Sequence, residues 1–175
     1  MLFLETSLKI WQVNPIKNAQ MLSIFSSLLD SLGINTVLNN WLSSNFEDFN
    51  TYILGLFAKQ ENKEPDLIRF YIEVLNRTVQ QGSDILLCCR HFQAIFKFIL
   101  EAFLTINEYE MTRTIFHFFS SFVSAKDISL SELGIKKIPE IIHSLMIRCV
   151  DINKSLLHNM SIVLVNIFTV HKNSF

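Results

Sequence analysis

The chain has 175 residues, with fifteen Lys and Arg against sixteen Asp and Glu, so its formal net charge at pH 7 is -1. This balance gives no broad basic field and argues against non-specific binding of nucleic acid. Half of the residues are apolar and only 18% are charged, against about 25% in an average globular domain, which excludes intrinsic disorder. Four Gly and three Pro are too few for a β-sandwich or a barrel with many tight turns.

The spacing of apolar residues is helical almost throughout, and no run of strict alternation predicts a strand. The start of a helix is indicated by Asn14 before Pro15, by Pro65 before Asp66, and by Asn107 with Glu110 as a capping box. Gly33 and Gly82 are typical of helix ends, whereas Ser131, Gly134 and Pro139 mark the last long connection. The predicted helices cover residues 1–12, 15–32, 46–60, 66–81, 86–106, 108–125, 135–149 and 152–171, with a short helical turn near 37–42.

Alternate predicted helices recur at intervals of about 42 and 44 residues in the second half of the chain, and the first interval is longer because of the loop at 33–45. The second, fourth, sixth and eighth begin near residues 15, 66, 108 and 152. Helix pairs that recur every ~40–47 residues are typical of HEAT and armadillo arrays. We therefore predict an all-α fold, a single α-solenoid segment over residues 1–175 with about four helix pairs, near 1–32, 46–81, 86–125 and 135–171. A single four-helix bundle is the alternative, but eight helices of this length do not fit it.

The two ends of a solenoid are expected to differ from its middle, because terminal repeats need a polar outer face. The predicted Met1–Trp11 helix is apolar and has no cap, so we expect a fragment or a C-terminal segment of a longer array, with an exposed apolar patch at this helix. Glu5 interrupts any signal peptide, and Gln93, Lys97 and Glu101 interrupt the most apolar window. A soluble, intracellular chain is the expectation.

Residues with reactive side chains form no recognisable catalytic pattern. The five His are scattered, at 91, 117, 143, 158 and 171, and no two lie four residues apart on one predicted helix. Cys88, Cys89 and Cys149 include no C-x-x-C pair, which indicates a reducing compartment and buried, inert thiols. Although Cys88-Cys89-Arg90-His91 resembles a reactive thiol beside basic residues, core packing explains it. Two acidic pairs, Glu47 with Asp48 and Glu108 with Glu110, are predicted to stabilise helix N-termini.

We therefore predict a protein that is not an enzyme, with no catalytic residues, cofactor or metal site. A helical enzyme whose site is assembled from scattered His and Glu is the alternative from another class.

The central part of the chain resembles a known family. The residues that carry the resemblance are Asp66–Leu75 with Gln81–Cys88, the helix Phe92–Ala102, the acidic loop Asn107–Glu110 and the Phe-bearing helix Phe116–Phe122. Together with Trp11–Pro15, they are similar to the C-terminal HEAT repeats of the importin-13 and transportin-3 branch of the importin-β (karyopherin-β) nuclear transport receptors. The resemblance covers roughly residues 1–125.

The resemblance implies the cargo-binding C-terminal segment of a Ran-dependent import or export receptor, present in cytoplasm and nucleus. Its partners would be protein cargo, Ran GTPase through the parent receptor, and nucleoporins, with no direct binding of nucleic acid or membrane. The alternative is an unrelated HEAT-type adaptor without Ran dependence. In either case the second helix of each pair would form the binding face. The same residues are also explained by a polar face that contacts only solvent. The candidate residues are Arg69, Glu73, Arg77, Glu110, Arg113, His117 and His158.

Overall fold

The computed structural model describes residues 6, 18–32, 36–59, 64–81 and 83–172. Within these residues every regular element is a helix, which confirms the all-α fold class. The elements are α2 (Asn18–Leu32), α3 (Thr36–Lys59), α4 (Pro65–Gln81), α5 (Ser83–Leu87), α6 (Phe92–Thr105), α7 (Tyr109–Val123), α8 (Ile128–Arg148), the 3-10 turn η2 (Lys154–Leu156) and α9 (Leu157–His171).

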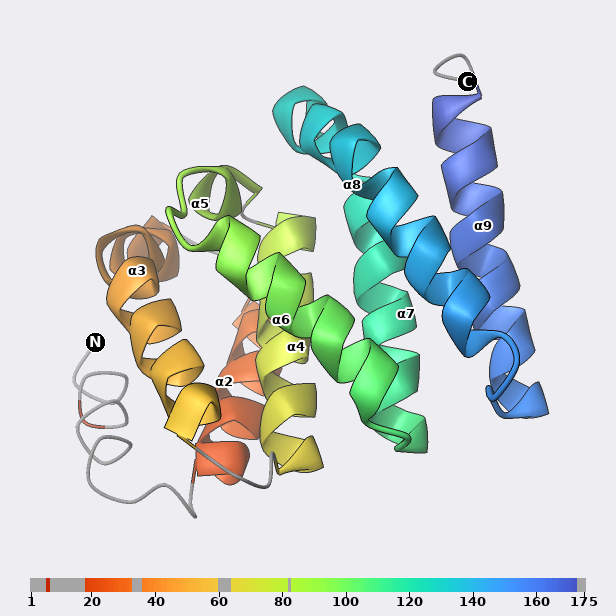
Figure 1. Cartoon of the computed structure of the whole chain (residues 1–175). Coiled ribbons are helices and arrows are strands. Elements are labelled where there is room, and N and C mark those ends of the chain that lie inside the picture. Colours follow the sequence, from red (N-terminus) through yellow and green to blue (C-terminus); the bar gives the residue numbers. More distant parts are fainter. Residues whose placement is uncertain (1–5, 7–17, 33–35, 60–63, 82, 173–175) are drawn as a thin grey trace.

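The helices form two layers (Figure 1). In one layer α2, α4, α7 and α9 follow one another, with contacts between α2 and α4, between α4 and α7, and between α7 and α9. These four helices run in the same direction, and they are the second, fourth, sixth and eighth helices of the predicted series. The other layer contains α3, α6 and α8, which run in the opposite direction (Figure 1).

Aromatic side chains fill the space between the layers. The rings of Phe57 on α3 and Phe98 on α6 stack with their centroids 4.4 Å apart, and Tyr71 of α4 contacts both rings. Farther along, the Phe103 ring of α6 meets Phe119 of α7 edge-on at 5.7 Å. The Phe-rich stripe therefore forms core between stacked helices, as its spacing predicts.

The third helix begins ten residues earlier than predicted. Residues 36–45, expected as a connection with a short turn at 37–42, belong to the continuous helix α3. Within the added segment, Leu42 is buried and extends an apolar stripe at intervals of three and four residues, which continues with the buried Phe46, Phe49, Ile53 and Phe57. Burial of this stripe outweighs the polar residues between them.

The predicted helix 86–106 is divided in two. α5 ends at Leu87, residues 88–91 form a turn, and α6 begins at Phe92. In this turn the Phe92 N–H donates to the Cys89 carbonyl at 3.2 Å, and the Arg90 N–H donates to the Glu47 carboxylate of α3. A tertiary contact thus stabilises the interruption, which contains neither Gly nor Pro.

The helix α8 contains the residues that were predicted to form a connection. It starts at Ile128, and the Asp127 carboxylate caps it by accepting a hydrogen bond from the Leu130 N–H at 2.9 Å. Gly134 and Pro139 both lie inside the helix. A Cβ atom at Gly134 would lie 3.3 Å from the Phe122 carbonyl oxygen, so the glycine allows α8 to approach the end of α7 closely.

Two further helix starts differ from prediction. The cap of α7 is Glu108, not Asn107: its carboxylate accepts hydrogen bonds from the Glu110 and Met111 N–H groups at 3.0 and 2.6 Å. Asn107 instead accepts a hydrogen bond from the Arg148 guanidinium at 3.3 Å. The last helix begins at residue 157, not 152, because η2 precedes it.

Some predictions lie outside the described residues. They are the helix 1–12 apart from residue 6, its apolar patch, the start at Asn14-Pro15, and the terminating Gly33 and Gly82.

Candidate protein-binding surface

The structure brings six of the seven candidate residues together. Arg69, Glu73 and Arg77 are four residues apart on α4 and therefore share one face. Glu110, Arg113 and His117 lie in the same way on the adjacent helix α7. We call these six residues the charged strip. His158 is exposed on α9. Among the described residues, the interactions that link the six residues of the strip do not include His158.

Ion pairs neutralise the α4 side of the strip. The Arg69 guanidinium lies 3.0 Å from the Asp66 carboxylate one turn earlier on α4. The Arg77 guanidinium lies 3.1 Å from the Asp30 carboxylate and so connects α4 with α2. Such pairs at a surface contribute only about 0–1 kcal/mol each. Their main effect here is that neither guanidinium is an isolated positive charge.

Glu73 lies at the centre of the strip, half-buried between Arg69 and Arg77. Burial raises the pKa of its carboxyl group above the ordinary value, and the negative charge of Glu110 on α7 adds to this effect. The charges of the two Arg side chains and a hydrogen bond with Ser26 of α2 lower the pKa of Glu73, but they do not cancel the effect of burial. The charged groups of the strip on α4 and α7 therefore influence one another, and Asp30 and Ser26 of α2 interact with them.

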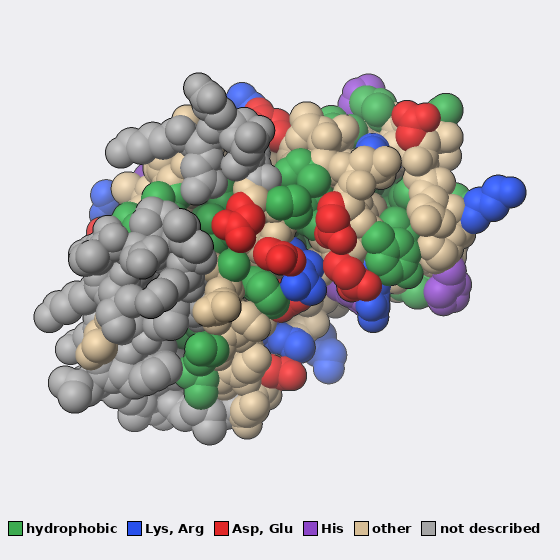
Figure 2. Space-filling view, turned by 90° about the horizontal axis from the view of Figure 1, so that it is seen from below, with side chains coloured by type: hydrophobic (Ala, Val, Ile, Leu, Met, Phe, Trp, Pro, Cys, Tyr) green, Lys and Arg blue, Asp and Glu red, His purple; other side chains and the backbone are tan. Residues whose placement is uncertain are grey.

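The α7 side of the strip is more open to solvent. The Arg113 and Glu110 side chains are 49% and 46% exposed and lie 3.4 Å apart. Partial burial lowers the pKa of His117, and the charge of Arg113 lowers it further, so the imidazole is neutral at physiological pH. Figure 2, which shows the molecule from below, has acidic and basic side chains close together in the middle of that face.

Polar contacts between helices continue alongside the strip. The Gln80 amide of α4 donates to the Ser121 hydroxyl of α7 at 3.0 Å. The Asn166 amide of α9 donates to the Ser120 hydroxyl of α7 at 2.6 Å. Sequence reasoning did not select Ser120, Ser121 or Asn166, and the only signal was a polar Ser pair on a Phe-rich helix.

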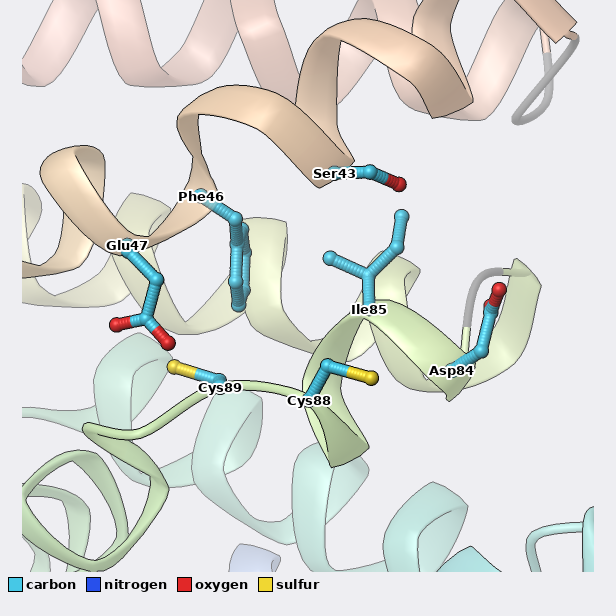
Figure 3. A pocket seen from close by; sticks show the side chains of 7 residues that line it. All are labelled: Ser43, Phe46, Glu47, Asp84, Ile85, Cys88 and Cys89. Atoms are coloured by element: carbon cyan, nitrogen blue, oxygen red, sulfur yellow. The ribbon is translucent and has the colours of Figure 1, made fainter.

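A separate pocket of about 280 Å³ lies between α3 and the α5–α6 turn (Figure 3). Burial raises the pKa of the Cys89 thiol to about 11, so the neutral thiol, which is a poor nucleophile, dominates at neutral pH. Cys89 is buried as predicted, whereas Cys88 and Cys149 are exposed, because they lie in a turn and at the end of α8. The pocket is lined by Ser43, Phe46, Glu47, Asp84, Ile85, Cys88 and Cys89.

The Glu47 carboxylate beside this pocket holds the turn in place. It accepts from the Arg90 N–H and lies 3.5 Å from the His91 imidazole, which is also 3.0 Å from the Thr51 hydroxyl. The prediction that Glu47 and Asp48 lie at a helix N-terminus is wrong, because both lie inside α3. The pair Glu108 and Glu110 does lie at the N-terminus of α7.

The described residues contain no group of three or more His, Cys, Asp and Glu that could hold a metal ion. Within the same residues, no helix combines the length and the apolar character that crossing a membrane requires. Comparisons with protein-family models, curated proteins and solved structures give no match. A functional interpretation of this chain therefore depends on its residues and their geometry.

Proposed function

We propose that this chain is a protein-binding segment of an α-solenoid of the HEAT type, which holds a partner protein on the charged strip of α4 and α7. The observation that carries the proposal is the row α2, α4, α7 and α9, whose neighbouring members are in contact. A row of parallel helices presents a continuous surface made of one element from each repeat, and solenoid proteins bind extended partners on such surfaces.

The layer arrangement supports a solenoid over a four-helix bundle. Helices of a bundle surround one axis, whereas here α4 has α2 on one side and α7 on the other. The direction of the chain alternates between the layers (Figure 1), as in stacked antiparallel helix pairs.

The chemistry of the strip fits a protein partner with mixed charge. Because acidic and basic groups alternate along it, the strip offers no uniform positive field for a nucleic acid. Arg113, paired with Glu110, is the most exposed of the three Arg side chains of the strip. They can exchange their weak mutual contact for ion pairs with a partner, which gives specificity more than affinity.

The more specific form of the proposal follows from the importin-β resemblance. The partner would then be a transport cargo, bound in cytoplasm or nucleus and released or captured according to Ran-GTP. A HEAT-type adaptor would bind its partner regardless of Ran. Partner binding in the presence and absence of GTP-locked Ran distinguishes these two forms.

The test compares two charge reversals on opposite layers. Arg113→Glu reverses the charge of an exposed basic side chain of the strip. Lys97→Glu is the matched control, since Lys97 is 77% exposed on α6 and also pairs with an acidic residue on its own helix. We expect partners captured from cell lysate, quantified by mass spectrometry, to be lost with Arg113→Glu and retained with Lys97→Glu, at equal unfolding midpoints. Retention by Arg113→Glu, or equal loss with both variants, would contradict the proposal.

A further inference from the structure

Arg148 is a charged residue buried at the end of α8. Its exposed fraction is 7%, although Arg is almost never buried to this extent without an ionic partner. Among the described residues, none of the ion pairs includes Arg148. A buried charge lowers stability unless an opposite charge or hydrogen bonds compensate it. The guanidinium therefore needs compensation from the groups around it.

The compensation within the described chain is incomplete. A guanidinium has five N–H donors. The one side-chain hydrogen bond that Arg148 makes to the described residues runs from Nη2 to the Asn107 Oδ1 atom at 3.3 Å, slightly longer than a typical bond of about 2.7–3.2 Å. The Nε–H group is enclosed and has no acceptor. The Phe103 ring centroid of α6 lies 5.7 Å from the guanidinium carbon, and this cation–π contact offsets only part of the cost of burial.

One end of the guanidinium lies beside the surface. Asn107, which accepts the hydrogen bond from Nη2, is exposed in the connection between α6 and α7. The helices α6 and α8 both end on the side of the molecule where α7 begins (Figure 1). An acceptor from outside the chain can therefore approach Nη2 next to Asn107 without opening the core.

The acidic residues closest in sequence do not supply this acceptor. The Glu108 carboxylate caps α7 and accepts hydrogen bonds from two backbone N–H groups of that helix. Asp151 is exposed after the end of α8 and forms no ion pair with Arg148 within the described residues. A carboxylate from outside matches the planar guanidinium, and its charge-assisted hydrogen bond is stronger than the neutral one to the Asn107 amide.

We infer that Arg148 binds a carboxylate of a protein partner, an Asp or Glu side chain that takes the place of the Asn107 amide as acceptor at Nη2. Desolvated Arg side chains are among the residues that contribute most to protein–protein binding. Tyr109 and Ile147, which are 41% and 48% exposed, offer apolar contact near Asn107 and Arg148 in the sequence. The inference rests on the proposed function for the kind of partner, and it adds the chemical group that the partner presents.

The experiment titrates the full chain with the peptide acetyl-Ala-Glu-Ala-amide and with its Gln counterpart, which has the same shape without the charge. NMR follows the Arg148 Nε–H signal and the Asn107 amide signals at constant ionic strength. The Glu peptide should shift both signals saturably, and the Gln peptide should not. Arg148→Met should weaken binding about tenfold or more, because the bond to a charged acceptor is lost. Arg90→Met is the matched control, since Arg90 is exposed in the turn before α6, and it should bind like the parent.

A second variant supplies the missing charge from within the chain. Asn107→Asp places a carboxylate at the position that accepts the hydrogen bond from Arg148. It should raise the urea midpoint of unfolding and block binding of the Glu peptide, because the guanidinium then has its own anion. The same substitution in the Arg148→Met background should not raise the midpoint. Because Asn107 is exposed, this variant keeps the test valid if Arg148→Met does not fold.

The inference would be overturned by a parent chain that shows no saturable shift, by an equal response to the Gln peptide, or by unchanged affinity in Arg148→Met. Undiminished binding of the Glu peptide by Asn107→Asp would also overturn it. None of these variants alters the charged strip. If Arg113→Glu abolished partner capture but the parent bound no Glu peptide, this inference alone would be rejected, and the proposed function would stand.

Discussion

The Tyr71 hydroxyl of α4 is a buried polar group with a hydrogen-bond partner on another helix. It donates to the Asn50 amide oxygen of α3 at 2.6 Å, and the Asn50 amide nitrogen donates to the Phe46 carbonyl at 2.6 Å. Both side chains are completely buried. Burial raises the pKa of Tyr71 well above its ordinary value, and the neighbouring Cys89 adds to this, so the phenol stays protonated as a donor.

Tyr71→Phe should therefore lower the free energy of unfolding by about 1–3 kcal/mol, because it leaves the buried Asn50 oxygen without a donor. Urea unfolding measures the effect. Tyr109→Phe is the control, since Tyr109 is exposed at the start of α7 and its substitution should change stability by less than about 0.5 kcal/mol. An equal effect of both substitutions would show that the Asn50 contact contributes nothing specific.

Glu73 gives the molecule a predictable dependence on pH. Since its pKa is raised in the folded state, the folded chain binds more protons than the unfolded chain between the unfolded value of about 4.3 and the raised value. Stability contributed by this group is therefore lost as pH rises through that window. Glu73→Gln removes the titration, so the variant should gain stability relative to the parent over the same rise in pH.

Urea unfolding of parent and variant at several pH values between about 4 and 7 tests this sign. Glu132→Gln, a substitution of an exposed residue on α8, is the control for the loss of one negative charge. A variant that becomes relatively less stable as pH rises would mean that Arg69 and Arg77 dominate over burial.

At the scale of elements, the sequence predicted helices wherever the apolar spacing and the cap agreed. Pro65 and Asp66 placed the start of α4 to within one residue. The prediction failed where packing overrides local signals: Gly134 and Pro139 lie within α8 because close packing against α7 and the Asp127 cap favour a continuous helix. The turn at residues 88–91 depends on Glu47, more than forty residues away, and local sequence carries no signal for it.

The candidate site was likewise predictable within each helix but not between helices. Spacing on each helix was sufficient to group the residues of α4 and those of α7. It could not show that α2 contributes Asp30 to Arg77, or that Glu110 acts on Glu73, because these interactions depend on how helices lie relative to one another. The predicted binding role of the strip is still a prediction.

The packing of α7 against α6 gives a direct prediction for Phe119. Its side chain is fully buried, with ring centroids 6.4 Å from Phe96 and 5.7 Å from Phe103, as the stripe on α7 predicted. Phe119→Ala should lower the free energy of unfolding by about 3–5 kcal/mol, a large part of the 5–15 kcal/mol typical of a domain.

Arg113→Glu changes the opposite side of the same helix and breaks only an exposed ion pair, so unfolding should change by about 1 kcal/mol or less. Urea unfolding of the two variants side by side measures both effects. If the two variants lost similar stability, the assignment of the buried and exposed faces of α7 would be wrong.

At the scale of the whole molecule, stability should vary along the array. α4 is packed between α2 and α7, and α7 between α4 and α9, whereas α9 contacts α7, α8 and η2 and carries exposed apolar side chains such as Val165. In an array of this kind, each helix is stabilised mainly by its neighbours, so a helix at the edge of the described array has fewer sources of stability than one in the middle.

Hydrogen exchange should reveal this gradient. Amides of α4 and α7 are expected to exchange most slowly, near the rate set by global unfolding, and amides of α9 faster, through local opening. Mass spectrometry of peptic fragments measures the exchange of each helix separately. Slow exchange of α9, equal to that of α4, would mean that the described array unfolds as one unit.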